Sequence, residues 1–235
     1  MTLTLYTAPT GNGRKPLLFI KLLDIPHEIH MFKWPAGDQL KQDWYLKLNP
    51  HGVIPTLVDG DLVLCESNAI LQYLAETYDK DGKFSYKLAT NPIEYWQQSK
   101  WMFYQATQFA GTLKSFNVYI KVEGNDKNVF NSYLDEFERT YKVMDDQLKE
   151  NTWFVGDKFT FVDLAFAVEN TWFVGDKFTF VDLAFAVGHH RRNEVCKLID
   201  DDVSFKGYDT KFPHVEEWYN RVLAIPGVKE GFELK

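Results

Sequence analysis

The chain has 235 residues, of which 45% are hydrophobic and 25% are charged. This composition can build packed cores and excludes a disordered tail. A formal net charge of −7 argues against a nucleic-acid partner, because phosphates need a basic surface. No apolar run is long enough to span a bilayer, and the first residues lack a secretory signal. Two cysteines, Cys65 and Cys196, give no disulfide framework. We therefore expect a cytoplasmic protein that binds neither nucleic acid nor membrane.

The first part of the chain alternates between strand and helix patterns. Residues 2–7 alternate polar and apolar side chains, a Pro/Gly-rich turn follows, and Pro16 stands where the first turn of a helix is expected. The next signals predict a strand at 27–32 and a helix at 38–48. A hairpin is predicted at 54–64, around the turn Asp59-Gly60-Asp61, and a further helix begins at 67. The order is βαβαββα.

The second part of the chain is predicted to be entirely helical. A polar linker at 80–92 separates it from the first part, and no convincing strand pattern follows. We therefore expect a small α/β domain at 1–79 and an all-α domain at 93–235.

Residues 150–168 read ENTWFVGDKFTFVDLAFAV, and residues 169–187 repeat this sequence without a change. Stacked repeat proteins need at least three units, so a solenoid is excluded. We favour a simple tandem duplication of one element. The alternative is a functional duplication that creates an interface or a switch.

Each copy carries a helix-capping pair, Thr160 with Asp163 and Thr179 with Asp182. Two copies cannot fill one core position. Because the second copy continues directly into the downstream segment, we predict that 179–195 forms the buried central helix. The first copy would then be displaced or would extend the preceding helix, and its aromatic residues would lie on a surface unless a partner covers them. These are Trp153, Phe154 and Phe161.

The richest segment for function runs from Asn49 to Leu74. A cis bond at Ile54-Pro55 would turn the backbone outward, where an extended peptide can pair with it as an added strand. Glu66 and Ser67 stand at a helix start, whose N–H groups attract a carboxylate, and Glu66 could accept a hydrogen bond from an ammonium group. A ligand with a peptide bond, a carboxylate and an ammonium group fits the outward-facing backbone, the helix start and Glu66 together. The alternative is that Ser67 is only a helix cap and Pro55 only an edge proline.

The chain resembles the cytosolic glutathione transferases over essentially its full length. The resemblance is carried by NPHGVIPTLVDGDLVLCESNAILQYLAETYD and by GDKFTFVDLAFA. It implies a thioredoxin-like domain followed by a helical bundle, with glutathione as substrate and no metal or other cofactor. The glutathione-binding residues that it implies are Ile54, Val53, Pro55, Glu66, Ser67, His51, Gln39 and Lys41.

The loop after the first strand contains no cysteine, which excludes a dithiol mechanism of the protein itself. It offers instead the Thr10 hydroxyl, the Asn12 amide and helix N–H groups, which can stabilise the thiolate of bound glutathione. The loop resembles that of nu-class and fungal nitrogen-regulator-like transferases, although Gly11 stands where those often have proline. The resemblance implies catalytic Thr10 and Asn12, and disulfide reduction with two bound glutathiones.

Three further features carry alternatives. Aromatic and polar residues after the linker could line an acceptor pocket or simply pack in the core; the candidates are Phe103, Tyr104, Thr107 and Gln108. Tyr6 fits ordinary strand packing better than catalysis. The adjacent His189 and His190 point to different helix faces, so we expect no metal there.

These observations predict a glutathione transferase that acts on a small electrophile or a disulfide. A homodimer is expected from the resemblance alone. Two alternatives stay open: a non-catalytic binding or regulatory module, and a variant whose helical domain is damaged by the duplication.

Overall fold

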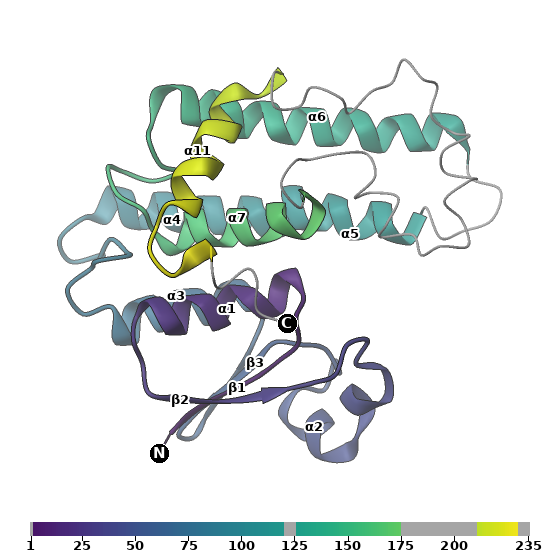
Figure 1. The fold of residues 1–235 in the computed structure, drawn as a ribbon, viewed down its shortest axis with the longest axis vertical. Helices are drawn as coiled ribbons and strands as arrows, with labels where there is room; N and C mark the ends of the chain where they lie inside the picture. Colours follow the sequence, from purple (N-terminus) through teal and green to yellow (C-terminus); the bar gives the residue numbers. More distant parts are fainter. Residues whose placement is uncertain (1, 120–125, 175–210, 230–235) are drawn as a thin grey trace.

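The computed structural model describes residues 2–119, 126–174 and 211–229 (Figure 1). Its four-stranded sheet contains β1 (Leu3–Thr7), β2 (His27–Met31), β3 (Thr56–Asp59) and β4 (Leu62–Cys65), in the order β2-β1-β3-β4. β1 pairs with β2 in parallel and with β3 antiparallel, so that Leu5 lies beside both Ile29 and Leu57. The predicted order of strands and helices along the chain and the predicted hairpin are confirmed.

Two helices cover one face of this sheet, α1 (Gly11–Leu22) and α3 (Ser67–Tyr78) (Figure 1). The prediction that Pro16 lies in the first turn of α1 is wrong, because the helix already begins at Gly11. Thr10 sets this start, since its hydroxyl accepts a hydrogen bond from the N–H of Gly13 at 3.1 Å. The helix predicted at 38–48 is split into a 3-10 turn, η1 (Gly37–Lys41), and α2 (Asp43–Leu48).

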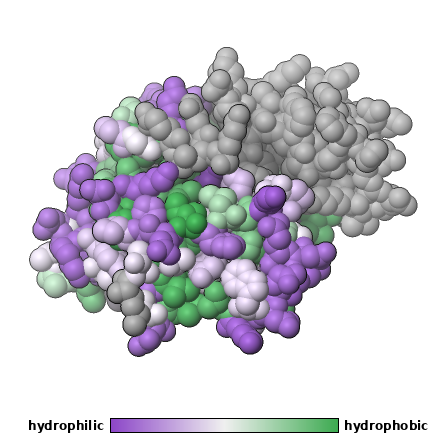
Figure 2. Space-filling view, turned by 60° about the horizontal axis from the view of Figure 1, so that its bottom comes forward, coloured by the Kyte–Doolittle hydropathy of each residue, from purple (hydrophilic) through white to green (hydrophobic). Residues whose placement is uncertain are grey.

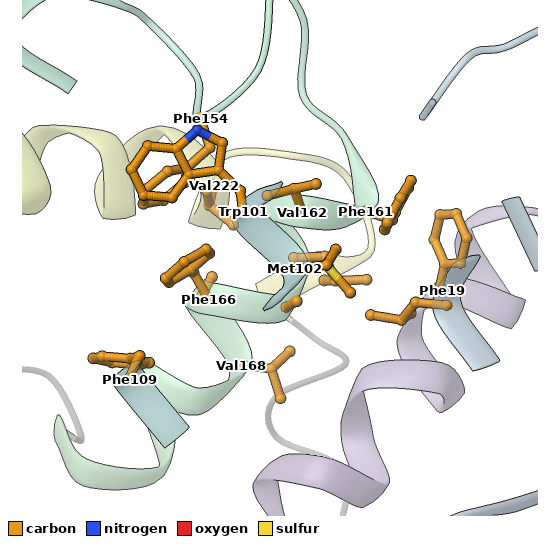
Figure 3. Close-up of a cluster of buried hydrophobic side chains, with 14 of the residues drawn as sticks. Phe19, Trp101, Met102, Phe109, Phe154, Phe161, Val162, Phe166, Val168 and Val222 are labelled. Carbon is orange, nitrogen blue, oxygen red and sulfur yellow. The ribbon is translucent and has the colours of Figure 1, made fainter. Parts of the chain in front are cut away.

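The second part contains helices and connecting loops, and no strand in the residues described. It contains α4 (Pro92–Tyr104), the π-helical segment η2 (Gln105–Phe109), α5 (Ala110–Tyr119), α6 (Lys127–Glu150), α7 (Phe161–Val174) and α11 (Pro213–Leu223). α7 lies in the middle of this group (Figure 1). In Figure 3, buried side chains from α4, α7 and α11 surround one another, and Phe19 of α1 lies near Phe161 of α7. Their ring centroids are 6.0 Å apart.

The first copy of the duplication supplies the buried central helix. Asp163 is fully buried, and its carboxylate accepts hydrogen bonds from the N–H groups of Phe154 and Thr160, the Thr160 hydroxyl and the indole of Trp218. Burial raises the pKa of this carboxyl, and the four donors oppose the shift. The Thr160–Asp163 capping pair is therefore confirmed. The assignment of the central helix to 179–195 is wrong in that Thr160 begins it; residues 179–195 themselves lie outside the described ranges.

The predicted exposure of the first copy's aromatic residues is wrong as well. Phe154 and Phe161 are buried, and Trp153 is half-buried. Phe154 stacks on Phe166 with ring centroids 4.2 Å apart and meets the edge of Trp218 at 5.0 Å. The first copy, which comes directly after α6, fills these core positions.

The linker residues bind the two halves of the molecule together. The N–H of Phe161 donates to the carbonyl of Phe84 at 3.0 Å. The phenol of Tyr86 donates to the Asp157 carboxylate at 2.6 Å, and Lys158 donates to the carbonyl of Ser85 at 2.9 Å. The first copy of the duplication thus packs against the first domain as well as within the second.

Candidate active site

A cavity of about 290 Å³ opens where α1 begins, beside the loop that leads into β3. Figure 2 shows this sheet-bearing side of the molecule, where hydrophobic surface is gathered at the centre among hydrophilic side chains. The cavity is lined by Thr10, Gly11, Asn12, Trp34, Leu40, Val53 and Ile54. Both predicted catalytic residues and two of the predicted glutathione-binding residues therefore share one cavity.

The start of α1 directs hydrogen-bond donors toward this cavity. The first N–H groups of a helix have no partner within the helix and carry its positive dipole end. The loop must pass very close to the helix here: a Cβ on Gly13 would lie 2.2 Å from the carbonyl oxygen of Ala8. Only glycine is compatible with this approach, so Gly13 allows Thr10 and Asn12 to stand at the cavity wall.

Asn12 is exposed to the cavity, and its side-chain oxygen is fixed by hydrogen bonds from two neighbouring side chains. That oxygen accepts hydrogen bonds from the Lys15 ammonium and from the Ser67 hydroxyl, each at 3.0 Å. Because an ammonium group can only donate, the atom facing it must be the amide oxygen. The amide nitrogen is thereby left to donate toward the cavity.

Lys15 continues this contact into the boundary between the two domains. It is buried, and its ammonium group also donates to the side-chain oxygen of Gln105 in η2 at 3.3 Å. The same Gln105 oxygen accepts a hydrogen bond from Asn68 of α3 at 2.9 Å. A polar network thus joins Asn12 to the helical domain.

The loop before β3 is held in shape by Asn49. Its amide nitrogen donates to the carbonyl of Val53 at 2.7 Å and to the Thr56 hydroxyl at 3.1 Å. The phenol of Tyr45 donates to the same Val53 carbonyl at 2.6 Å. The Ile54–Pro55 bond that follows is cis, as the sequence allowed. Val53 and Ile54 thereby lie at the cavity wall.

Glu66 and Ser67 stand where α3 begins. Glu66 is exposed with a φ of 70°, a left-handed conformation that costs a non-glycine residue about 1 kcal/mol or more. Ser67 is buried and reaches Asn12 through its hydroxyl. The two candidate groups, at the starts of α1 and α3, are therefore linked by a hydrogen bond.

The other expected glutathione-binding side chains do not line the cavity. His51 and Lys41 are exposed on the connections that border it. The amide of Gln39 is used by its own loop, since it donates to the carbonyls of Lys33 and Ala36 and accepts from the N–H of Lys33. Of these three, Lys41 and His51 keep side chains available for a ligand.

The expected acceptor residues on α4 and η2 also lie outside the cavity wall. Phe103 is 72% exposed and Thr107 is exposed, whereas the Tyr104 phenol donates to the carbonyl of Thr140 at 3.5 Å, and Gln108 is half-buried. Their role in an acceptor pocket stays a prediction. Tyr6 packs among His30, Trp44 and Tyr45 on the open face of the sheet, which agrees with an ordinary packing role.

Within the described ranges there is no cluster of three or more His, Cys, Asp or Glu residues able to hold a metal ion. In those same ranges no helix has the length and apolar character to cross a membrane. Cys65 is a partly buried free thiol. Cys196 and the pair His189–His190 lie outside the described residues.

The sequence analysis missed Trp34 and Leu40 at the cavity wall, and Lys15 and Gln105 behind it. A large aromatic residue followed by proline, in a loop after a strand, was the available signal for Trp34. Nothing in the local sequence marks Gln105, because its importance comes from a contact with a distant helix.

Comparison with known proteins places this geometry in a family. The glutathione S-transferase N-terminal domain model matches residues 5–82, and the C-terminal domain model matches 110–170 and 166–226. The two C-terminal matches overlap at the duplication. Glutathione S-transferase 2 of Schizosaccharomyces pombe is 32% identical, over 98% of this chain and 94% of its own length.

Two solved structures from Lodderomyces elongisporus are similar over nearly all of both chains. A glutathione S-transferase-like protein has 41% identity and a TM-score of 0.79, and covers 100% of this chain and 96% of its own. A glutathione transferase homologue with two glutathiones per subunit has 31% identity and a TM-score of 0.73, with coverage of 99% and 98%.

The matched domains, the fold and the cavity together define a glutathione transferase fold, with a thioredoxin-like domain and a helical domain. The chain belongs to the glutathione S-transferase family, among fungal, yeast-type members.

Proposed function

We propose that this protein is an enzyme that binds glutathione in the cavity at the start of α1 and uses its thiolate as the nucleophile. The observation that carries the proposal is the fixed orientation of Asn12, whose oxygen is held by Lys15 and Ser67. The amide nitrogen is then a ready donor to a sulfur anion, close to unpaired N–H groups of the helix start.

The tripeptide would be held along the cavity wall by three groups. The backbone of Ile54, between Val53 and Pro55, would pair with the cysteinyl unit, and Glu66 with Ser67 would hold the γ-glutamyl end at the start of α3. Lys41 and His51, on the bordering connections, are the remaining candidates for the glycine carboxylate. Thr10 would assist Asn12 at the sulfur, because its hydroxyl hydrogen is still available for donation.

The physical role of these donors is to favour the thiolate over the thiol. A free thiol has a pKa near 8.5, and each unit by which the pKa falls requires about 1.4 kcal/mol of differential stabilisation. The free energy by which a positioned amide donor and a helix N-terminus together stabilise an anion is of that magnitude. Near neutral pH, a one-unit shift increases the reactive thiolate severalfold.

Two reactions are open to this thiolate. It can attack an electrophilic carbon, forming a carbon–sulfur bond and expelling a leaving group. It can also attack a disulfide, forming a mixed disulfide and releasing one thiolate; a second glutathione then releases the other thiolate and leaves oxidised glutathione. The relative with two glutathiones per subunit supports the second reaction. We further propose a cytoplasmic homodimer, on the family relationship alone.

The test compares the wild-type chain with Asn12→Ala in conjugation of a chloronitrobenzene and in glutathione-dependent reduction of a small disulfide. We expect kcat to fall about 10²-fold while the KM for glutathione changes little, because the amide acts on the developing sulfur charge. Asn151→Ala, at the exposed end of α6, is the control. Equal losses in kcat and in glutathione affinity would contradict the thiolate role, and a wild-type chain that binds glutathione without turnover would indicate a binding module.

A further inference from the structure

Lys15 is a buried lysine that the proposed mechanism uses only to orient the Asn12 amide. The residue is 1% exposed, and its ammonium group, at the domain boundary, donates to Asn12 at 3.0 Å and to Gln105 at 3.3 Å. Removing an ammonium group from water is costly, and lysine is among the residues least often found fully buried. A buried cation directly behind a candidate catalytic amide therefore calls for a functional explanation.

The contacts of Lys15 act on Asn12 in two ways. The ammonium fixes the amide orientation, since only the oxygen can face it. It also polarises the amide, because a charged donor on the oxygen withdraws electron density and makes the N–H groups on the opposite side stronger donors. Both effects favour an anion on the cavity side of Asn12.

The helical domain holds the ammonium in this position. Gln105 lies in η2, a π-helical segment between α4 and α5, and is fully buried. π-helical turns are uncommon and frequently occur at functional sites. Gln105 accepts from both Lys15 and Asn68 through one oxygen, so it ties α1, α3 and η2 together.

We infer that Lys15 is a positioning residue that acts through Asn12 to favour the glutathione thiolate, with Gln105 of the second domain holding its ammonium group in place. The inference rests on the proposed function, since it concerns the same sulfur. The inference goes beyond the proposed function because it makes the thiolate chemistry of the first domain depend on a polar contact from the helical domain.

The experiment measures the thiol pKa of bound glutathione from its ultraviolet thiolate band, in the full chain. Lys15→Met keeps the length of the side chain without its charge. In this variant Asn12 keeps its hydrogen bond from Ser67, and Gln105 keeps that from Asn68, so neither acceptor loses its only donor. We expect the thiol pKa to rise by about one unit, with glutathione affinity changed less than about threefold.

A second variant tests the same idea without removing the lysine. Gln105→Glu places a negative charge beside the ammonium and keeps an acceptor for Asn68. It should raise the thiol pKa by part of the Lys15→Met effect. Lys21→Met removes an exposed charge from the last turn of the same helix and should leave the thiol pKa unchanged. Arg14, which precedes Lys15 on α1, and Glu66, which precedes Ser67 at the start of α3, stay the same in every variant.

A double variant separates an action through Asn12 from a purely structural one. In an Asn12→Ala background, Lys15→Met should change the thiol pKa clearly less than it does in the wild type. The kcat of Lys15→Met should recover as the pH is raised, because the thiolate then forms without help.

Three outcomes would contradict the inference, in whole or in part. If wild-type glutathione shows a lowered thiol pKa and Lys15→Met leaves it there, the role of Lys15 is overturned, whatever happens to the melting temperature. If the wild-type chain binds no glutathione, the proposed function fails and this inference fails with it. If Gln105→Glu has no effect while Lys15→Met does, the charge of the ammonium does not act on the sulfur, and the electrostatic part of the inference is wrong.

Discussion

The hexapeptide Glu-Asn-Thr-Trp-Phe-Val occurs twice in this chain and adopts two backbone conformations. At 150–155 it ends α6 and continues as a loop, whereas at 169–174 it forms the last turns of α7. The local sequence is identical, so its own preferences cannot decide the outcome. The first occurrence turns because the Asp163 carboxylate captures the N–H of Phe154 and because the Phe154 ring fills a space beside Trp218. Tertiary contacts thus outweigh local propensity.

The largest expected effect comes from Phe154→Ala, compared with Phe173→Ala at the equivalent position of the second copy. Phe154 is fully buried in the stacked aromatic core, so its truncation should cost about 3–5 kcal/mol of unfolding free energy. Phe173→Ala should cost much less if the first copy alone fills this core. Chemical denaturation of both variants measures the difference. Equal losses would show that the two copies share the position.

A smaller effect is expected at the linker contact of the first copy. Tyr86→Phe removes the phenol that donates to Asp157 at 2.6 Å and should cost about 1 kcal/mol. Burial, and then the hydrogen bond to Asp157, raise the pKa of Tyr86 to about 12. Because the unfolded chain releases this proton near pH 10, the wild type should lose stability as the pH rises from about 10 to 12.

The phenylalanine variant should lose less stability across that alkaline window, as measured by melting temperature against pH. The second copy again provides a matched pair. Asp157→Ala should reduce the alkaline loss, and Asp176→Ala should leave it as in the wild type. If Tyr86→Phe and the wild type show parallel curves above pH 10, the phenol does not contribute as described.

The smallest effect is expected when one copy is removed. Deleting either copy yields the same shortened chain, in which the remaining copy would follow α6 as the first copy does now. The melting temperature should change by no more than a few degrees and glutathione affinity by less than about threefold, because the core position stays filled. A large gain in stability would support the view that the duplication damages the helical domain, and a large loss would show that both copies are needed.

Much of the first domain could be predicted because its signals are local. Alternation predicts the strands, the Asp59-Gly60-Asp61 turn predicts the hairpin, and the loop without cysteine places Thr10 and Asn12 together at the start of α1. The proline pattern predicts a helix start near Pro16, which is too late, because α1 begins at Gly11. The Thr10 cap, which begins the helix at Gly11, was the stronger signal.

The rest could not be read from local patterns, because it depends on contacts between distant segments. Local sequence cannot decide whether Thr160 or Thr179 begins the central helix, since each belongs to a copy of the same capping pair. The choice was decided by packing against α1 and by Trp218 of α11. Likewise Lys15 looks like an ordinary surface lysine until Gln105, far along the chain, is placed beside it.

The central claim is that this chain, with the duplication in place, retains a working glutathione site at the start of α1. Isothermal titration of reduced glutathione into the full chain tests it most directly. The account predicts saturable binding with a Kd below about 1 mM. It is contradicted if a chain that melts cooperatively shows no saturable heat with glutathione at millimolar concentrations.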